Sequence, residues 1–564
     1  MPIKPSPRLA LPLGLLFAVT ASLPATAATL TAAGGGAASE RPLPATHAQR
    51  ELDVRVLHLQ GVSARAVALV RAQLEHALVG RTLTRAGLQQ AISQATASLR
   101  GEGFLVGQVY ASPEQVAELR RTGVLNLTVF PGQVGALDIH NTSQVETEEL
   151  RKVAVTALCP TGMGSGCDLM AANYERMTQL LQAVPGVELG VVQLSPRDVA
   201  PGQTRMRIEV GQAQPRVQGS VQLDNQGAAV VGRNRTTLSL LANNLLHRGD
   251  ELGLTLQDTA RNDASGSISL AAPLGSRGLR WTLAASRSQF SFGNLNVKST
   301  ANTLAAGLQY PFERSLQRDV TGSVQAAQVK SRSSVLGYTV SDKTLDQFIT
   351  TLSADSGPGV PTRTRMHTWS GSVALTVGHV SDPATLPASF SPSGSYAKVA
   401  FQGAFNQLLS QRADSDVYWS AVAHGQWANR NLDPSEKMGI GGPQGVRAYP
   451  IEEGSFDQGL LATFTLAARL PTRAGTLVPN AFVDAAWGQI NHAPYPNWQV
   501  QNGYVDSQLP NTRSLADFGL GLSWLLPHKL SVSVVWAHKM PGSPSSAIPQ
   551  QSTSRFWLAV QAGF

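Results

Sequence analysis

The sequence predicts two small α+β modules followed by an all-β membrane barrel, and three features support this fold class. The N-terminus carries a secretory signal, which marks the chain for export. The middle of the chain repeats one order of strands and helices with a period of about eighty residues. From residue 214 to residue 564 the pattern changes to strands alone, which alternate between apolar and polar side chains.

Length and composition limit the class of protein. The chain has 564 residues, too many for one compact domain, and only 15% are charged and 6% aromatic. Many short amphipathic strands fit this composition, whereas a disordered chain or a helical membrane protein does not. The formal charge of +8 comes mainly from scattered Arg residues, so we expect no nucleic-acid binding. The eleven His residues form no cluster with metal-ligand spacing, so we expect no metal site.

Residues 1–28 have the pattern of a secretory signal peptide. Basic residues precede an apolar segment at 9–23, and a small-residue cleavage pattern ends near Ala27. A single membrane anchor is the alternative, but the short apolar core and its prolines argue against it. Residues 29–51 are rich in Gly and Pro and are predicted to form a flexible linker.

Residues 52–132 are predicted to form one module in the order strand, helix, helix, strand, strand. Apolar residues recur at helical spacing in two segments, which begin near Val67 and Leu88. Residues 133–213 repeat the same order of elements. This repetition indicates two tandem copies of one module.

The two cysteines of the chain, Cys159 and Cys167, lie between the predicted helices of the second module. In an exported protein, a structural disulfide that closes this short loop is the leading interpretation. A redox-active pair is the alternative, but the C-x-x-C spacing is missing. In the chain-entropy model such a bond stabilises the fold by about 2–3 kcal/mol.

Sixteen candidate strands lie between residues 217 and 564. In one of them, the apolar residues from Leu530 to Trp536 alternate with serines. One face toward lipid and one toward water are typical of an outer-membrane barrel, whose closure leaves no unpaired edge. A soluble sandwich, with its apolar face in a core, is the alternative. With both ends of the barrel in the periplasm, the connection after the eleventh strand, 416–427, is extracellular.

That connection contains the segment Gly439–Pro450, whose four glycines and two prolines predict a loop with tight turns. Gly441 and Gly442 precede a central group of large side chains instead of the usual polar filler, namely Val446, Arg447 and Tyr449. An ordinary Gly-rich β-turn is the alternative. A phosphate-binding loop is not supported, because the G-x-G-x-x-G spacing and a following Lys-Ser/Thr are both missing.

Two strands after this loop, Phe482 and Asp484 share one face of a candidate strand, and Val483 and Trp487 lie on the other. The apolar face would meet lipid, so Asp484 is expected to face the lumen and accept the planar fork of Arg447. An unpaired, solvated Asp is the alternative. Since a wet lumen would screen the ion pair, we expect it to contribute about 1–2 kcal/mol.

The predicted barrel begins with a hairpin that carries its own motif. Asp224, Asn225 and Gly227 mark a turn, and Gly232 and Arg235 follow it. A generic turn followed by a basic residue is the alternative.

Together these motifs resemble those of the two-partner secretion outer-membrane transporters, the TpsB family of haemolysin secretion/activation proteins. The core of the loop is similar to the family's Val-Arg-Gly-Tyr/Phe motif, with Ala448 in place of Gly. The tandem repeats resemble the family's polypeptide-transport-associated (POTRA) modules. Three further features resemble its first barrel hairpin, its Phe-x-Asp strand motif and its terminal assembly signal: Asp224-Asn225-x-Gly227, Phe482-x-Asp484 and the final Phe564.

The resemblance implies two periplasmic POTRA domains, at 52–132 and 133–213, and a 16-stranded transmembrane barrel at 214–564 with an extracellular loop folded inward. It implies an outer-membrane channel that captures one large unfolded exoprotein, an adhesin or haemolysin, and exports it without ATP. Other implied partners are membrane lipid and the barrel assembly machinery, and the chain would be a monomer. No cofactor and no enzymatic activity are expected, because hydrolase, zinc-protease and P-loop motifs are missing from the sequence.

Two other functions stay open. One is a factor that inserts other barrels into the membrane, although such factors usually carry more tandem modules. The other is a passive solute porin, which has no need of periplasmic repeats. In contrast, exposed strand edges and apolar grooves on the repeats would suit the capture of an extended partner.

Overall fold

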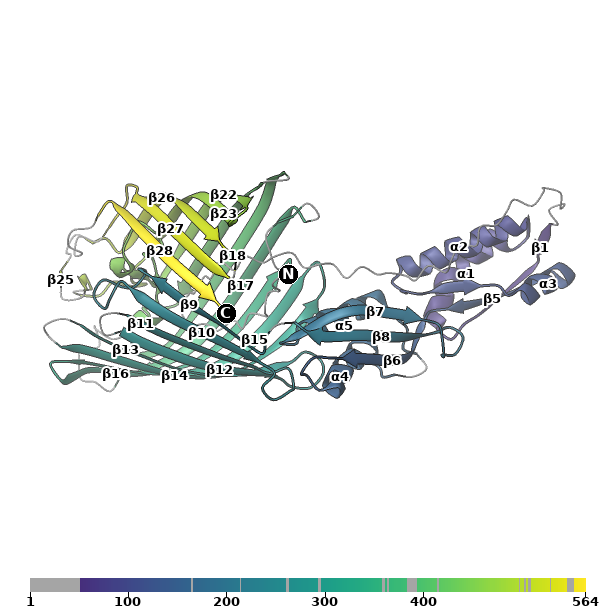
Figure 1. Ribbon diagram of the computed structural model, residues 1–564, viewed down its shortest axis with the longest axis horizontal. Helices are drawn as coiled ribbons and strands as arrows, with labels where there is room; N and C mark the ends of the chain where they lie inside the picture. The colour runs from purple at the N-terminus through teal and green to yellow at the C-terminus, as the bar shows by residue number, and fades with distance from the viewer. Residues whose placement is uncertain are drawn as a thin grey trace. The chain divides into compact units, whose positions relative to one another are not determined.

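The computed structural model describes residues 51–564 apart from 164–165, 214, 260–262, 293–295, 358–360, 363–364, 383–392, 413–414, 497, 502–503, 506–508, 528 and 545–551. The predicted signal peptide and all but the last residue of the predicted linker therefore lie outside the described residues. The chain divides into two compact units, one ending at Ala213 and one at Phe564 (Figure 1). Among the described residues, no helix is long and apolar enough to cross a membrane.

The first module combines a three-stranded sheet, a two-stranded ribbon of β1 and β3, and three helices. In the sheet, β5 lies in the centre, parallel to β2 and antiparallel to β4. Its elements are β1 (Leu52–Val54), β2 (Val56–Gln60), α1 (Ala64–Leu78), β3 (Arg81–Leu83), α2 (Arg85–Gly101), β4 (Gln108–Tyr110), α3 (Pro113–Thr122) and β5 (Val124–Phe130).

Helical periodicity explains the core of this module. Val70, Leu74 and Leu78 recur every four residues on α1, so they share one face, and all three are fully buried. They pack in one cluster with the buried face of α2 and with alternate residues of β5, such as Leu125 and Leu127. The helices begin where the side chains of Ser63 and Thr84 accept backbone hydrogen bonds.

Helix α3 departs from the predicted order of elements. We expected a plain connection between two strands, but this helix separates β4, which ends at Tyr110, from β5. Helix α3 forms because Ser112 and Gln115 make a reciprocal capping box, with Pro113 in the first turn. Its mostly polar sequence concealed it, since only Leu119 is buried.

The second module has the predicted order. Its elements are β6 (Gln133–Asn141), α4 (Thr147–Leu158), α5 (Ala171–Gln182), β7 (Val187–Ser195) and β8 (Gln203–Gln212). The central strand β8 is parallel to β6 and antiparallel to β7. Its alternate residues Met206, Ile208 and Val210 face the two helices in a separate hydrophobic core.

The two modules contact each other through the segment that follows Cys167. The backbone N–H of Leu105 donates to the carbonyl of Leu169 at 3.0 Å, and that of Ala171 donates to the carbonyl of Gly103 at 2.8 Å. The carboxylate of Asp168 accepts hydrogen bonds from both modules, from Ser63 at 2.9 Å and Gln133 at 3.2 Å.

The remainder of the chain forms a closed antiparallel barrel of sixteen strands, which confirms the predicted fold class. The last strand pairs with the first, so the described part of the barrel has no open edge (Figure 1). The strands are β9 (Val217–Asp224), β10 (Arg235–Asn243), β11 (Glu251–Thr259), β12 (Asp263–Pro273), β13 (Arg280–Phe292), β14 (Val297–Arg314), β15 (Asp319–Val335), β16 (Tyr338–Asp355), β17 (His367–Ser381), β18 (Gly394–Gln411), β19 (Asp416–Ala428), β22 (Gln458–Thr472), β23 (Gly475–Gln489), β26 (Thr512–Leu525), β27 (Leu530–Lys539) and β28 (Ser554–Gly563).

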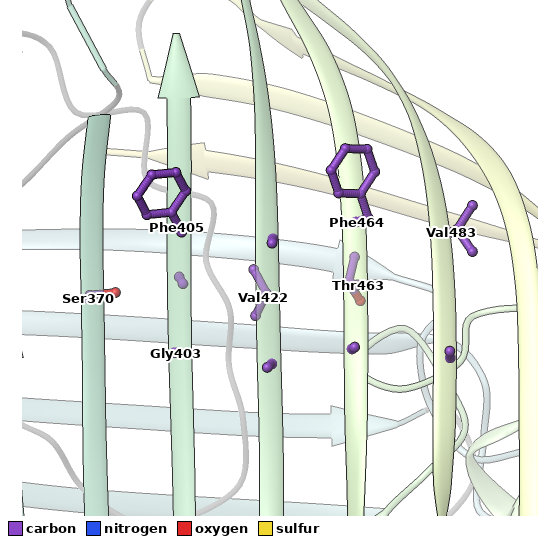
Figure 2. Close-up of a pocket in the computed structure, with 12 residues that line it drawn as sticks. Ser370, Gly403, Phe405, Val422, Thr463, Phe464 and Val483 are labelled. Carbon is purple, nitrogen blue, oxygen red and sulfur yellow. The ribbon is translucent and has the colours of Figure 1, made fainter. Parts of the chain in front are cut away.

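Alternating burial separates the two faces of the wall. On β23, Val483 and Trp487 are 46% and 62% exposed on the outer face, while Phe482 and Asp484 on the inner face are 3% and 0% exposed. The outer face carries a hollow of about 520 Å³, and Figure 2 shows Phe405, Phe464 and Val483 among the residues that line it. Further strands, β24 (Val500–Gln501) and β25 (Tyr504–Val505), form a hairpin between β23 and β26.

Candidate functional site

The candidate site is the chain between β19 and β22, residues 429–457, here called the lumen loop. It contains two 3-10 turns and two short paired strands, η1 (Pro434–Glu436), β20 (Met438–Gly439), η2 (Ile451–Glu453) and β21 (Ser455–Phe456). Ile440 and Tyr449 are buried in one cluster with Phe482 and Leu515 from the wall. Because Phe482 lies on the face opposite the exposed Val483, the loop occupies the inside of the barrel.

Close backbone contacts give the loop its shape. A Cβ atom on Gly441 would lie 2.0 Å from the carbonyl oxygen of Pro450, so only glycine fits there. Gly442 has a φ of 85°, and its N–H donates to the carbonyl of Tyr449 at 3.0 Å. Val446, fully buried, bridges back to Gly441. The glycines thus fold the large residues that follow them into a compact tip.

The structure brings Arg447 and Asp484 together. The guanidinium makes two parallel hydrogen bonds, from Nε to Oδ2 and from Nη2 to Oδ1, each 2.7 Å long. Thr463 on the neighbouring strand donates to the same carboxylate at 2.8 Å. The Arg447 Cζ atom also lies 3.3 Å from the centroid of the Phe482 ring. The Phe-x-Asp pair therefore supplies both an acceptor and an aromatic face to one guanidinium.

The expectation that lumen water would screen this ion pair is wrong. The Asp484 side chain is 0% exposed and that of Arg447 only 17%. The physical reason is that the buried side chains of Ile440, Val446 and Tyr449 cover this part of the wall. Removing one partner would therefore leave a buried charge unpaired, which typically costs about 3–5 kcal/mol.

Tyr449 anchors the other end of the tip. Its ring is 1% exposed, and Lys539 Nζ lies 4.7 Å from the ring centroid. Burial, reinforced by the nearby Glu453 carboxylate, raises the pKa of the Tyr449 phenol to about 12. The hydroxyl donates to the carbonyl of Met540 at 3.4 Å.

Two wall residues that the sequence analysis missed hold the backbone of the tip. The Ala448 N–H donates to the carboxylate of Asp517, and the indole Nε1 of Trp557 donates to the Arg447 carbonyl at 2.8 Å. Both residues could have been recognised in the sequence from their positions on the strands. An acid and a tryptophan occupy the polar, inward positions of strands whose other faces carry Phe518 and Phe556.

Buried ion pairs at the base of the loop were missed as well. Arg513 and Glu453 are both fully buried and bonded to each other. Lys437 Nζ lies 3.2 Å from the Asp457 carboxylate and also donates to the Ile490 carbonyl at 2.7 Å. Two further pairs link the loop to the wall, Lys343–Asp433 at 2.7 Å and Lys398–Glu436 at 3.0 Å. The sequence signal for these ion pairs was the number of acidic residues in the loop.

The predicted first-hairpin motif lies at the point where the barrel closes. Arg235 binds Asp224, with Nε 2.8 Å from Oδ1. Gly227 approaches Gly232, whose φ is 125°, so closely that a Cβ would lie 2.0 Å from the Gly232 carbonyl oxygen. The Asn225 amide donates to the Phe556 carbonyl at 3.1 Å and accepts from the Leu558 N–H at 2.8 Å.

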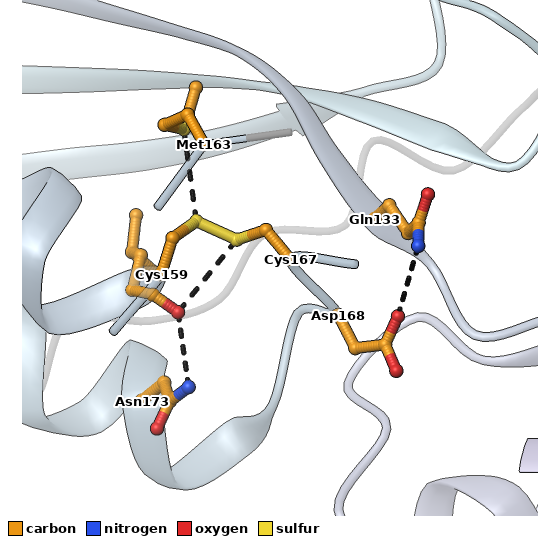
Figure 3. Close-up of a disulfide and its surroundings, with 7 residues drawn as sticks. Gln133, Cys159, Met163, Cys167, Asp168 and Asn173 are labelled. Carbon is orange, nitrogen blue, oxygen red and sulfur yellow. Dashed lines mark hydrogen bonds between the residues drawn. A yellow bond between two sulfur atoms is a disulfide. The ribbon is translucent and has the colours of Figure 1, made fainter. Parts of the chain in front are cut away.

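The remaining predicted residues lie away from the loop. Cys159 and Cys167 form a disulfide between α4 and α5, where Asn173 also donates to the Leu158 carbonyl at 3.0 Å (Figure 3). Phe564 is 58% exposed at the end of the last strand. Its backbone pairs with Gly219 on β9 in both directions, at 2.9 and 3.2 Å.

The closed barrel, the lumen loop and the preceding tandem modules define an outer-membrane protein transporter. The sequence model of the haemolysin secretion/activation protein ShlB/FhaC/HecB family matches residues 202–504, more than half of the chain. That of the ShlB-type POTRA domain matches residues 52–132. The chain therefore belongs to the ShlB/FhaC/HecB family, the TpsB transporters of two-partner secretion. Its barrel spans the outer membrane, and its POTRA modules are periplasmic.

Known proteins match this chain over nearly its whole length. The heme/hemopexin transporter protein HuxB of Haemophilus influenzae (strain 86-028NP) is 22% identical over 543 residues, covering 93% of this chain and 89% of that protein. The structure of CdiB from Escherichia coli has a TM-score of 0.69 at 17% identity, and CdiB from Acinetobacter baumannii has 0.66 at 16%. In both comparisons 93% of each chain is covered, which shows a shared fold.

Proposed function

We propose that this two-partner secretion channel exports one large exoprotein that threads unfolded through the barrel, with no ATP and no covalent chemistry. The observation that carries the proposal is the lumen loop, which the Arg447–Asp484 pair anchors to the inner wall. A loop held inside a channel by side-chain bonds can yield to a polypeptide that competes for the space.

The periplasmic modules would supply the capture step. In each module a three-stranded sheet has an outer strand that pairs on one side only, β4 in the first and β7 in the second. Tyr110 on β4 and Val191 on β7 are each 44% exposed. An unfolded chain can add a strand to such an edge, with backbone hydrogen bonds for affinity and apolar contacts for preference.

The proposed driving force for export follows from the location of the POTRA modules in the periplasm. The periplasm offers no ATP, so we infer that folding of the exported partner at the cell surface prevents its return. Membrane lipid surrounds the barrel, and the barrel assembly machinery inserts it. The transporter itself acts as a monomer.

A secretion assay tests the proposal against the two alternatives. Deletion of the transporter should leave one large exoprotein in the periplasm, while bulk outer-membrane proteins and solute uptake stay normal. A general loss of outer-membrane barrels would indicate an assembly factor instead. Reduced uptake of small solutes with normal exoprotein secretion would indicate a porin.

A further inference from the structure

One peptide unit at the tip of the lumen loop is held from both sides. Its carbonyl, that of Arg447, accepts a hydrogen bond from Trp557 Nε1 at 2.8 Å. Its N–H, that of Ala448, donates to the buried carboxylate of Asp517. These bonds come from β28 and β26, whereas the Arg447 side chain binds β23. The backbone attachment is thus separate from the Arg447–Asp484 ion pair.

Trp557 also lies at the seam where the barrel closes. The ladder between β28 and β9 runs from Ala559, paired with Asp224, to Gly563. Beyond this ladder, the Asn225 side chain joins the two strands. Its amide donates to the Phe556 carbonyl at 3.1 Å and accepts from the Leu558 N–H at 2.8 Å. Asn225 thus bonds both neighbours of Trp557, and the Trp557 indole, 4% exposed, reaches inward to the loop.

A second contact joins the loop to the same end of the seam. The Glu452 carboxylate on η2 accepts a hydrogen bond from the Ala229 N–H, in the turn between β9 and β10. The first and last strands therefore each contact the loop, one through that turn and one through Trp557.

We propose that Trp557 is a positioning residue that couples the loop to the seam. A loop tip bonded to Trp557 fixes the part of β28 that Asn225 holds against β9, and the seam in turn fixes Trp557. Displacement of the tip by a translocating chain would therefore loosen the β28–β9 seam. The coupling is reciprocal, because two sites that stabilise one arrangement must affect each other equally in free energy.

The test uses the full chain with a spin label at Gln444→Cys in the loop and hydrogen exchange at 217–224 and 556–563. Cys159 and Cys167 are bonded to each other, so the label attaches to the new thiol. Trp557→Phe keeps an aromatic ring but removes the Nε1 donor. Loss of one hydrogen bond should raise both label mobility and seam exchange, the latter by about two- to ten-fold. Trp487→Phe, on the exposed outer face, is the control and should change neither.

The reciprocal variant keeps the inference testable if Trp557→Phe folds poorly. Asn225→Ala removes the two side-chain bonds to β28, keeps the backbone bond from the Asn225 N–H to the Leu558 carbonyl at 3.2 Å, and does not touch the loop. It should also mobilise the label at position 444. Its control is Asn302→Ala, whose side chain accepts a hydrogen bond from Arg287 at 3.3 Å elsewhere on the wall. If either variant changes one site and leaves the other as in the parent, or changes neither, loop and seam are independent and the inference is overturned. The inference goes beyond the proposed function, and its readouts need no export partner, so its failure would leave the export proposal intact.

Discussion

Asp484 on β23 and Asp517 on β26 are register partners, so two buried carboxylates lie side by side on the inner wall. The tip of the lumen loop contacts both, the Arg447 guanidinium binding Asp484 and the Ala448 N–H donating to Asp517. Adjacent buried carboxylates repel each other unless a cation or donors stabilise them. The inner wall thus carries acidic groups at this point, and the loop tip supplies one cation and one amide N–H to bind them.

Arg447→Ala should impair export much more than barrel assembly. The variant leaves the buried Asp484 unpaired, which costs about 3–5 kcal/mol and releases one attachment of the loop. Asp484→Ala should give a similar defect, and the double variant should lose less than the sum, because both changes break one interaction. Export rates of the four proteins and their amounts in outer-membrane fractions provide the measurement.

A matched control for this cycle is Arg332→Ala. Arg332 also binds a carboxylate across neighbouring strands, that of Asp342, but its side chain is 65% exposed. Such a pair contributes about 0–1 kcal/mol, so export should stay normal. Additive losses in the Arg447–Asp484 cycle would contradict the pairing.

Gly441→Ala should displace the loop tip and reduce export. A Cβ at this position would lie 2.0 Å from the Pro450 carbonyl oxygen and 2.9 Å from the Glu453 Cβ, so the backbone must move. Gly439→Ala, two residues earlier, is the control, because its Cβ would meet nothing within 4 Å. Protease cleavage of the loop in intact outer membranes should increase for the first variant only. Equal behaviour of the two would show that the close approach is not required.

The sequence was sufficient for the fold because side-chain alternation has a fixed period of two. This alternation places Val483 and Asp484 on opposite faces of their strand. It therefore indicated which residues face the lumen before their contacts with the loop were known. The strand count followed from the same alternation, whereas the tandem repeat followed from helical spacing and a repeated order of elements. The structure places the predicted Arg447 and Asp484 at bonding distance, although they are 37 residues apart in the chain.

Other parts depend on pairings that local patterns do not encode. Ala448 and Asp517 are 69 residues apart, and Arg447 and Trp557 are 110 apart. Both contacts require the register of strands β23 to β28 and the path of a loop inside the barrel. Burial of the Arg447–Asp484 pair could not be predicted either, because it depends on how tightly the loop packs. Helix α3 was missed for a different reason. Its capping signals were present in the sequence, but its residues are mostly polar and only Leu119 is buried.

Replacing Cys159 and Cys167 together with Ser should destabilise the second module without unfolding the barrel. The bond closes a loop with a sequence separation of 8, for which the chain-entropy model gives about 2–3 kcal/mol. Denaturant unfolding of residues 51–213 measures this free energy. An unchanged midpoint would show that packing alone holds this segment.

Deleting residues 52–132 should abolish export but leave an inserted barrel. The first module has its own hydrophobic core, and the buried residues of the second module's core all lie outside the deletion, although Leu105 and Val106 of the first module pack against them. Heat-modifiable migration of the barrel and its amount in the outer membrane test insertion, and secretion of the exoprotein tests capture. Met170, which packs against the first module, should be changed to a polar residue in the truncated chain to avoid an exposed apolar patch. Normal secretion by the truncated protein would contradict a role of this module in capture.

Phe564→Ser should lower the amount of protein in the outer membrane. Phe564 ends the last strand on its outer face, and its ring packs over Gly219 of the first strand. Phe556→Ser is a close control, since Phe556 lies on the same face of β28 and is 63% exposed, against 58% for Phe564. Each change removes an aromatic side chain from lipid, a loss of about 1.5–3 kcal/mol of transfer free energy. If the terminal aromatic is read during assembly, only Phe564→Ser should leave folding intermediates in the periplasm, visible in pulse-chase fractionation. Equal losses for the two variants would mean that lipid contact, and not the terminal position, determines the amount of inserted barrel.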